Sequence, residues 1–449
     1  MKTVIMAGGK GTRISELFPD IPKPMIPICG KPVLEWEIEE LEEQGFKDII
    51  LTVSHLHEKI EEYFGDGQKW GVHIEYFVEH VPLGNAGALF KIRDRIGDEP
   101  FLLLNADAVF DVDFTRMVQY HKEHSALVTL FTHPNSHPYD SGLLVTDETD
   151  AVISWLTKED IRPEYYKNRV NAGLHVIDPK VLEALSLNND VNSINVNLIG
   201  CEVDGKVVKV DLDRQILKPL CGSGKMIAYD SPEYVKDMGT PERFHLVCRD
   251  FEAGIVRAKN LKNRQKAIFL DRDGTLNKYI GFLRDADNFE LIPGVAEAVK
   301  KINASGYLAI VITNQPVIAR GEVTVEQLTL IHNKMETLLG KEGAYLDAIY
   351  YCPHHPDKGF EGEIKELKIN CDCRKPKPGL LYKAAEKFNI DLSASVMIGD
   401  GKRDIQAGKA AGCKTILLTG QYGESDKDDD FGQDETANNL LEAVELILD

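Results

Sequence analysis

The sequence contains no long hydrophobic run, and positive charge is in deficit. No apolar stretch approaches the roughly 20 residues that a membrane-spanning helix requires, and a strand-like run begins at Thr3, which leaves no room for a secretory leader. We therefore expect a cytoplasmic protein. The 52 Lys and Arg residues against 72 Asp and Glu residues give a formal net charge of −20. Nucleic acid and anionic membrane would repel such a surface, so neither is expected as a partner. Association into a homo-oligomer is compatible with this charge.

Cysteine is scarce, and internal repeats are absent. Of the eight cysteines in 449 residues, five are scattered and three gather with a histidine, as Cys352, His354, Cys371 and Cys373. In a reducing compartment such a group indicates a metal site rather than disulfides. Cys-x-His and Cys-x-Cys within one loop, residues 352–373, supply the four ligands of a closed tetrahedral site, which predicts a structural Zn²⁺. Two alternatives remain: His355 in place of His354, and a reduced loop without metal.

The length and two phosphate-type signatures predict two α/β domains. A chain of 449 residues exceeds what one core usually supports. Short apolar runs at residues 3–6 and 267–270 each precede a signature, Gly8-Gly9-Lys10-Gly11-Thr12-Arg13 in the first case and Asp271-Arg272-Asp273-Gly274-Thr275 in the second. Strand-like runs at 48–53, 73–78, 101–105, 126–131 and 170–177 alternate with helical stretches such as 33–44 and 85–96. This alternation predicts, in each domain, a mostly parallel sheet flanked by helices.

The domain limits follow from the same patterns. We place one domain over residues 1–245 and another over residues 265–449. A polar helical stretch that begins near Pro241 predicts a helical connector over residues 246–264. A charged run after Gln421 predicts a solvated loop, and a short amphipathic helix is expected over residues 437–448.

The first signature indicates a phosphate-binding turn. A glycine-rich turn after a strand lets backbone N–H groups approach a phosphate, and Arg13 adds a fork of donors. Its spacing matches neither a dinucleotide fingerprint nor a P-loop. It is followed in order by Pro22-Lys23-Pro24-Met25, Leu83-Gly84-Asn85-Ala86-Gly87-Ala88, Leu104-Asn105-Ala106-Asp107, Asn171-Ala172-Gly173 and Asp237-Met238-Gly239-Thr240-Pro241. In that order these strings resemble the sugar-1-phosphate nucleotidylyltransferase family, from Met1 to about Phe244.

The resemblance implies a role for each string. Arg13 and Lys23 would neutralise charge at the α-phosphorus and on the departing pyrophosphate, and Asp107 and Asp237 would jointly hold Mg²⁺ between nucleotide and sugar phosphate. The triphosphate would be cradled by Gly8, Gly9, Gly11 and Thr12. The base would face Gly84, Asn85 and Gly87. The sugar would contact Asn171 and Gly173, and Lys158 would bind the phosphate of the sugar. The sequence departs from the family pattern at Asn85, where Thr is usual, at Ala106, where Gly is usual, and at the neighbours of Lys158, Thr157 and Glu159.

The second signature places two aspartates one residue apart after an apolar strand. Such a pair can divide nucleophilic and proton-transfer work when both side chains point into one turn. It is followed by Val311-Ile312-Thr313-Asn314-Gln315, Arg374-Lys375-Pro376-Lys377-Pro378 and Ile398-Gly399-Asp400-Gly401-Lys402-Arg403-Asp404. These four strings together resemble the haloacid-dehalogenase (HAD) phosphatase superfamily.

This second resemblance implies a metal-assisted phosphatase site. Asp271 would attack phosphorus, and Asp273 would protonate the leaving oxygen and later activate water. The substrate phosphate would be bound by Thr313, Asn314, Arg374 and Lys375, and Mg²⁺ by Asp271, the Asp273 carbonyl and Asp400, with Asp404 in support. About forty residues separate Asp273 from Thr313, too few for a large helical cap, so an open HAD-like domain is expected. Departures occur at Pro316, where a small residue is common, and at Gly401, where Lys is common; Lys402 is the candidate substitute for that lysine.

The cysteine loop narrows the second activity, and the pairing of the two domains narrows both. Loop 352–373 resembles the histidinol-phosphatase and heptose-bisphosphate phosphatase branch. A heptose phosphatase of that branch releases a sugar 1-phosphate, which a nucleotidylyltransferase consumes. The resemblance therefore implies a bifunctional enzyme that removes the 7-phosphate of D-glycero-D-manno-heptose 1,7-bisphosphate and then transfers a nucleotidyl group to heptose 1-phosphate.

GTP is favoured as the donor, because the first domain resembles heptose- and mannose-1-phosphate guanylyltransferases more than the thymidylyl or adenylyl branches. One alternative is mannose 1-phosphate as the acceptor, beside a histidinol-phosphatase-like sugar phosphatase. The other is that one domain serves only as a non-catalytic sensor.

Overall fold

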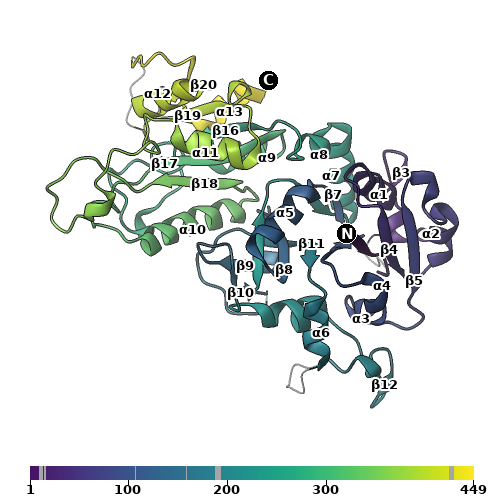
Figure 1. Cartoon of the computed structure of the whole chain (residues 1–449). Coiled ribbons are helices and arrows are strands. Elements are labelled where there is room, and N and C mark those ends of the chain that lie inside the picture. Colours follow the sequence, from purple (N-terminus) through teal and green to yellow (C-terminus); the bar gives the residue numbers. More distant parts are fainter. Residues whose placement is uncertain are drawn as a thin grey trace. The chain divides into compact units, whose positions relative to one another are not determined.

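The computed structural model of the chain describes residues 1–9, 14, 17–106, 108–157, 159–187, 194–423 and 429–448, and Figure 1 labels its elements. The chain divides into two compact units. The first unit comprises Met1–Thr132, Leu144–Trp155 and Asn171–Asn260, and the second comprises His133–Leu143, Leu156–Val170 and Leu261–Asp449.

The first unit is built on a nine-stranded sheet whose central strands are parallel. β1 (Lys2–Met6) lies between β6 (Phe101–Asn105) and β4 (Asp48–Val53), and β4 pairs with β5 (His73–Val78). Beyond β6 the direction reverses, because β11 (Val170–Ile177) pairs antiparallel with both β6 and β9. The other strands of the sheet are β8 (Val128–His133), β9 (Leu143–Thr146), β10 (Val152–Leu156) and β14 (Met226–Asp230).

Apolar side chains of β1 alternate between two cores, as the pleat of a strand requires. Val4 packs with Leu103 on one face, and Ile5 packs with Leu102 and Leu104 on the other. Helices α1 (Val33–Glu43), α2 (His57–Phe64) and α5 (Phe114–His124) contribute to the second of these cores, and α3 (Gly87–Lys91), α4 (Arg93–Ile96) and α6 (Lys180–Leu187) to the first. A separate ribbon pairs β7 (Ala108–Asp111) with β15 (Tyr234–Asp237), and α7 (Pro241–Glu252) and α8 (Ile255–Ala258) follow it. The two short pairs are β2 (Pro27–Ile28) with β3 (Lys31–Pro32), and β12 (Glu202–Val203) with β13 (Lys206–Val207).

The second unit is built on a six-stranded parallel sheet in the order β18-β17-β16-β19-β20-β21. Strand order reverses beside β16, and in such sheets the crevice at the carboxyl ends of the strands at the reversal binds ligands. The strands are β16 (Lys266–Leu270), β17 (Tyr307–Asn314), β18 (Ala348–Cys352), β19 (Val396–Gly399), β20 (Lys414–Leu418) and β21 (Glu435–Ala437). One face is covered by α9 (Val295–Asn303), α10 (Val325–Lys341) and α13 (Leu440–Leu448), and the other by α11 (Gly379–Phe388) and α12 (Lys402–Ala411).

The predicted fold class, two α/β domains with mostly parallel sheets, is confirmed. Four strands have the predicted bounds, but the helical stretch predicted over 85–96 forms the two short helices α3 and α4. The helix predicted over 437–448 begins at Leu440, because residues up to Ala437 pair with β20 as β21. The predicted connector is not one helix: Gly254, with φ +71°, separates α7 from α8. Between Asp273 and Thr313 the elements are α9, β17 and the single turn Ala286–Asn288, with no large cap.

The two units are not continuous in sequence. Residues 133–143 and 156–170, which lie inside the predicted first domain, belong to the second unit. No single boundary in the sequence separates the two units. The predicted domain limits, 1–245, 246–264 and 265–449, stay a prediction.

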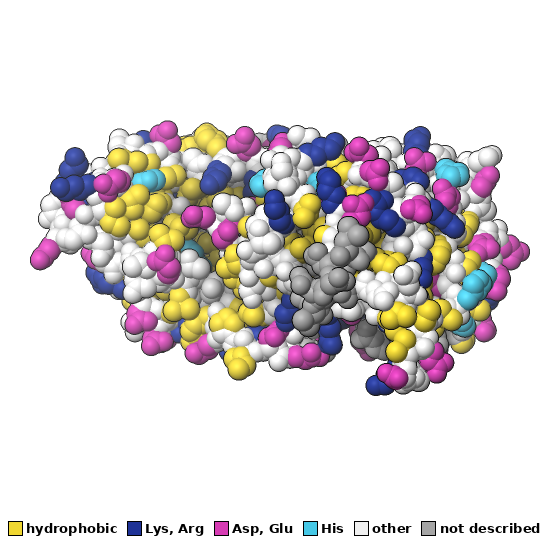
Figure 2. Space-filling view, turned by 60° about the horizontal axis from the view of Figure 1, so that its bottom comes forward, with side chains coloured by type: hydrophobic (Ala, Val, Ile, Leu, Met, Phe, Trp, Pro, Cys, Tyr) yellow, Lys and Arg dark blue, Asp and Glu magenta, His cyan; other side chains and the backbone are white. Residues whose placement is uncertain are grey.

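The surface carries charges of both signs. On the face drawn in Figure 2, acidic and basic side chains are interspersed, and hydrophobic side chains show in separate patches. Within the described part of the chain, no helix combines the length and the apolar character needed to cross a membrane.

Candidate functional sites

The first unit contains a cavity of about 820 Å³ at the carboxyl ends of its parallel strands. Gly8 and Gly9 follow β1 there, Asn105 ends β6, and Lys23 enters from the single turn Lys23–Met25. Gly84 and Asn85 line the same cavity. The structure therefore brings together part of the predicted triphosphate cradle, one predicted cation and two of the predicted base-facing residues. Gly11, Thr12, Arg13, Asp107 and Lys158 lie outside the described residues.

The base-facing segment is fixed by close backbone packing. Gly84 has φ +84°, and a Cβ there would lie 2.3 Å from the Val210 carbonyl oxygen, so only glycine fits. The Val210 amide donates to the Leu83 carbonyl at 2.8 Å, and the Leu212 amide donates to Asn85 Oδ1 at 2.7 Å. Asn85 therefore anchors this segment through its side chain. Gly87 lies behind it, where a Cβ would come within 2.8 Å of Leu83 Cβ.

Asp237 is held by cations at the end of β15. Its Oδ1 lies 3.3 Å from Lys23 Nζ and accepts from the Gly239 amide at 2.7 Å, and its Oδ2 accepts from Arg243 at 2.6 Å. Burial alone would raise the pKa of Asp237, but the charges of Lys23 and Arg243 and the Gly239 amide together lower it. β15 pairs Asp237 with Ala108, the residue after Asp107. An ionised carboxylate beside Lys23 suits a site for a hard divalent cation.

The predicted sugar contacts lie on β11. Asn171 Oδ1 accepts from the Gly173 amide at 3.2 Å and lies 3.2 Å from His175 Nε2. Gly173 has φ +77°, and a Cβ there would lie 2.4 Å from Asn105 Nδ2. Glycine at this position therefore lets β11 approach Asn105, which lines the cavity.

Six further polar residues line the cavity but were not predicted from the motifs: Ser54, His55, Glu79, His80, Lys209 and, on β4 itself, Thr52. The first four directly follow β4 and β5. Carboxyl ends of neighbouring parallel strands meet at one edge of a sheet, and this rule would have indicated them. Lys209 lies far away in sequence, next to the Val210 that packs on Gly84, and no motif marked it.

In the second unit Asp271 follows β16 and faces a buried lysine. Lys375 Nζ lies 2.7 Å from Asp271 Oδ1 and 2.5 Å from Asp404 Oδ1, and its side chain is 2% exposed. Single oxygens of Asp271, Asp400 and Asp404 all lie within 4.8 Å of one another. Burial and the charge of Asp404 raise the pKa of Asp271 to about 7, and Lys375 opposes that shift. Three carboxylates around one ammonium form a hard-oxygen site that fits a divalent cation.

Asp273 is oriented by three donors. Arg272 Nη2 donates to Asp273 Oδ2 at 2.8 Å and to its Oδ1 at 2.9 Å. Gln315 Nε2 donates to Oδ2 at 2.9 Å, and Asn277 Nδ2 donates to Oδ1 at 3.1 Å. Arg272 is fully buried and lies 3.3 Å from His332 Nε2 on α10. Burial and the charge of Arg272 hold the pKa of His332 well below its usual value, so this histidine is neutral and can accept.

The other residues predicted to bind the substrate phosphate are Thr313, Asn314 and Arg374. Thr313, the next-to-last residue of β17, is buried, and its hydroxyl accepts from Gln315 at 3.0 Å. Asn314 exchanges two 3.0 Å hydrogen bonds with the Lys375 backbone, so in this structure it positions the lysine. Arg374 donates to the His354 carbonyl at 3.2 Å. Burial lowers the pKa of Arg374, and the charges of Arg403 and Arg320 act in the same direction.

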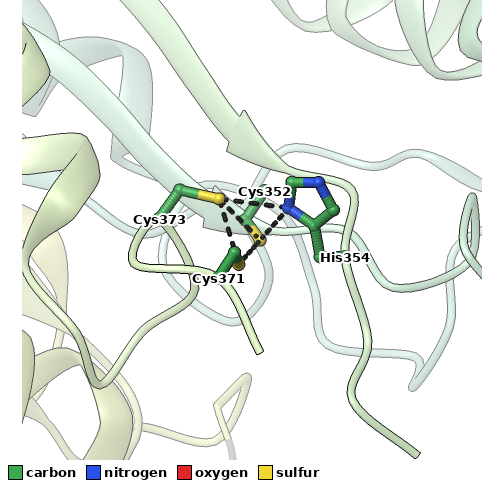
Figure 3. A group of neighbouring side chains, drawn as sticks. All are labelled: Cys352, His354, Cys371 and Cys373. Carbon is green, nitrogen blue, oxygen red and sulfur yellow. Dashed lines mark hydrogen bonds between the residues drawn. The ribbon is translucent and has the colours of Figure 1, made fainter. Parts of the chain in front are cut away.

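Cys352, His354, Cys371 and Cys373 converge at the end of β18 (Figure 3). Cys373 Sγ lies 3.3 Å from Cys352 Sγ, 3.2 Å from Cys371 Sγ and 3.2 Å from His354 Nδ1. All three thiols are free. His355 turns away, accepts from the Asp357 amide at 3.2 Å and packs edge-on against Phe360. The cluster therefore uses His354, and its four donor atoms could hold one metal ion.

Comparison with known proteins identifies the family of each portion of the chain. Residues 2–245, more than half of the chain, match the nucleotidyl transferase family, and residues 372–443 match the HAD-hydrolase-like family. The D-glycero-beta-D-manno-heptose-1,7-bisphosphate 7-phosphatase of Pasteurella multocida is 43% identical over 180 residues, which cover 40% of this chain and 93% of that protein. The chain belongs to both families. It is a bifunctional enzyme with a nucleotidyltransferase portion and a HAD phosphatase portion.

Two further relatives concern the nucleotidyltransferase. The UTP–glucose-1-phosphate uridylyltransferase of Synechocystis is 38% identical over 196 residues, which cover 41% of this chain and 50% of that protein. This chain therefore matches half of that relative's length. The crystal structure of HddC from Yersinia pseudotuberculosis complexed with GMP-PN is 25% identical, with a TM-score of 0.44, and covers 56% of this chain and 99% of that one.

Proposed function

We propose that the bifunctional enzyme catalyses two consecutive steps. The second unit removes the 7-phosphate of D-glycero-D-manno-heptose 1,7-bisphosphate, and the first unit transfers GMP from GTP to the resulting heptose 1-phosphate with release of pyrophosphate. The observation that carries the proposal is that one chain holds both the Asp271–Lys375 site and a nucleotide-sized cavity. The portion that holds Asp271 and Lys375 is similar to heptose-bisphosphate phosphatases. Removal of the 7-phosphate by the second unit yields a sugar 1-phosphate, which is the class of acceptor that nucleotidyl transfer in the first unit needs.

The geometry of the second unit supports attack by Asp271 and proton transfer by Asp273. Asp271 lies at the strand reversal beside Lys375, which would hold phosphate oxygens as the carboxylate approaches phosphorus. Asp273 is held one residue further on by Arg272, Gln315 and Asn277, in position to serve the leaving oxygen. Mg²⁺ held by Asp271, Asp400 and the Asp273 carbonyl would shield the two anions from each other. In the first unit Asp237, with Asp107, would hold the second Mg²⁺ near Lys23.

The Cys352–His354–Cys371–Cys373 cluster is proposed to hold a structural Zn²⁺. Three thiols and one imidazole fill four tetrahedral positions and leave none for water. The loop between Cys352 and Cys371 includes one short turn, Lys365–Leu367, so a metal would supply the constraint that a core does not.

A direct test is incubation of the pure protein with heptose 1,7-bisphosphate, Mg²⁺ and each of GTP, ATP, CTP and UTP in turn. We expect phosphate and pyrophosphate release and a GDP-heptose product with GTP. Product formed only from supplied mannose 1-phosphate would favour the alternative acceptor. The absence of any heptose-dependent nucleotide sugar would overturn the proposal.

The base is proposed to be read by Glu79, which lines the cavity beside Gly84 and Asn85. Its Oε2 accepts from the Leu83 amide at 3.3 Å. Guanine presents two adjacent donors, N1–H and the 2-amino group, that a carboxylate can accept together, whereas uracil presents one N–H between two carbonyls. Glu79→Gln should therefore lower kcat/KM for GTP by about tenfold to a hundredfold. The ratio of kcat/KM for GTP to kcat/KM for UTP should fall as well. Glu75→Gln is the control, because Glu75 lies on β5, the strand that Glu79 follows, but outside the cavity lining. Equal effects of the two variants would contradict this assignment.

The second phosphate of the bisphosphate is proposed to meet the guanidinium group of Arg320. This group lies between two rings, 4.2 Å from the centre of Phe282 and 4.3 Å from that of Phe360. Its charge contributes to the lowered pKa of Arg374, which precedes Lys375 in the chain. We expect Arg320→Met to raise KM for the bisphosphate about tenfold while p-nitrophenyl phosphate hydrolysis changes less than about twofold. Arg284→Met removes a half-exposed guanidinium over the same Phe282 ring and serves as the control. An equal loss with both substrates would show that Arg320 supports the fold instead.

A further inference from the structure

His332 is a buried titratable side chain that neither proposed reaction uses. It lies in the middle of α10, between Ile331 and Met335, which are fully buried and belong to the same hydrophobic core as β16. Its Nε2 lies 3.3 Å from Arg272 Nη1. A guanidinium group has donors only, so Nε2 accepts and the imidazole proton is on Nδ1. The helix therefore presents a fixed hydrogen-bond acceptor to Arg272.

The guanidinium group of Arg272 has two described partners, Asp273 and His332. Its Nε and Nη2 donate to the Asp273 carboxylate at 2.8 to 3.2 Å, and its Nη1 lies against His332. The side chain of Arg272 is 0% exposed, whereas that of Asp273 is 19% exposed. A donor buried this deeply is costly to leave without a partner. Because the guanidinium group is planar and rigid, holding Nη1 also holds the edge that faces Asp273.

The buried polar residues of α10 are His332, Glu336 and Thr337. Glu336 pairs with Arg169 at 3.2 Å, and Thr337 Oγ1 accepts from the Tyr166 amide at 2.9 Å. Among the described contacts of these three side chains, the contact of His332 alone reaches the guanidinium group that holds the candidate proton donor. The other two contacts serve as internal references, because they share the helix but not the site.

We propose that His332 is a positioning residue for proton transfer in the phosphatase. It holds Arg272 so that the Asp273 carboxyl group faces the leaving oxygen, which rests on the proposed role of Asp273. All three residues belong to the second unit. Without the acceptor on α10, Nη1 has to find another partner, and the guanidinium edge turns away from its present alignment. Protonation of the leaving oxygen should suffer more than attack by Asp271, which is paired with Lys375 instead.

Phenyl phosphate and p-nitrophenyl phosphate provide the test, because their leaving oxygens differ in the need for a proton. p-Nitrophenolate leaves readily as an anion, whereas the more basic phenolate gains more from a positioned acid. The parameter kcat/KM reports phosphoryl transfer to Asp271 and departure of the leaving group, and it excludes the later hydrolysis of the aspartyl phosphate. In the full chain, His332→Phe should lower kcat/KM about tenfold for phenyl phosphate and less than about twofold for p-nitrophenyl phosphate.

Two further variants separate positioning from support of the fold. His332→Gln supplies an amide oxygen that can accept from Arg272, and it should keep kcat/KM for both esters within about twofold of wild type. Thr337→Val removes a buried polar contact from the same helix and should leave the ratio of the two kcat/KM values unchanged. If His332→Phe does not fold, the smaller His332→Leu takes its place with the same expectation.

Asp273→Asn is measured alongside, because it reports the proposed role of Asp273 directly. A larger loss with phenyl phosphate in Asp273→Asn, but not in the folded Phe or Leu variant of His332, overturns the inference. An equal loss with both esters in that His332 variant also overturns it, because His332 would then only support the fold. An equal loss with both esters in Asp273→Asn removes Asp273 as the proton donor, and the inference falls with that proposed role.

Discussion

Replacing Asp271 with Asn is expected to lower phosphate release from the bisphosphate by about a thousandfold or more. An amide cannot attack phosphorus, and the substitution also removes one of three carboxylates that would hold the cation. Nucleotidyl transfer to supplied heptose 1-phosphate should change less than about twofold, because the other reaction uses the cavity beside Lys23. Phosphate and pyrophosphate release, measured separately on the same preparation, give the comparison.

The control for this variant is Asp372→Asn, whose carboxylate is almost fully exposed and pairs with Lys377. Asp372 lies between Cys371 and Cys373, and none of the described contacts of Asp271 involves it, so both activities should persist. Loss of both activities in a folded Asp271→Asn protein would contradict the assignment of two separate sites. Retained phosphate release would remove Asp271 as the nucleophile.

Replacing Cys371 with Ser is expected to remove the bound zinc and to lower the midpoint of thermal unfolding of the second unit by about 5–10 °C. The Cys371 thiol lies 3.2 Å from Cys373 and 3.6 Å from Cys352, and three ligands hold zinc far less tightly than four. Residual phosphatase activity should still require Mg²⁺, because the cation site at Asp271 uses other residues. Metal analysis and calorimetry on the purified protein measure the two effects.

Cys201→Ser is the matched control, since Cys201 is exposed and its thiol contacts only the Asn197 carbonyl in a described interaction. It should keep one zinc per chain and the wild-type unfolding midpoint. A Cys371→Ser protein that also kept one zinc per chain would show that the ligands have been misassigned.

Some side chains that the motifs name are brought together by the structure. Asp271 and Asp273 lie in one turn, and Lys375, a motif residue more than a hundred positions away, meets Asp271 at 2.7 Å because the parallel strands around β16 share one edge. The choice of His354 over His355 required the structure, since adjacent histidines differ only in the direction of their side chains.

Other features could not be read from local patterns. Most residues of the 85–96 stretch favour a helix, but the backbone turns at Ile92 and produces two helices. Glu336 carries no motif, and its partner Arg169 lies 167 positions away. Pairings over such distances depend on the packed fold, so neither residue was predicted to matter.

The discontinuous second unit also has a consequence for how the protein is made. Segments 133–143 and 156–170 leave the ribosome roughly 150 residues before α10 does. At elongation rates of about 5–20 residues per second, the delay is roughly 8–30 seconds. During that interval Arg169 has no carboxylate from α10, and the surface around Pro138 that Gly340 will cover is open to solvent. Segments 133–143 and 156–170 therefore stay unpacked until α10 of the phosphatase portion has been synthesised. A chain that ended near residue 260 would keep these segments exposed.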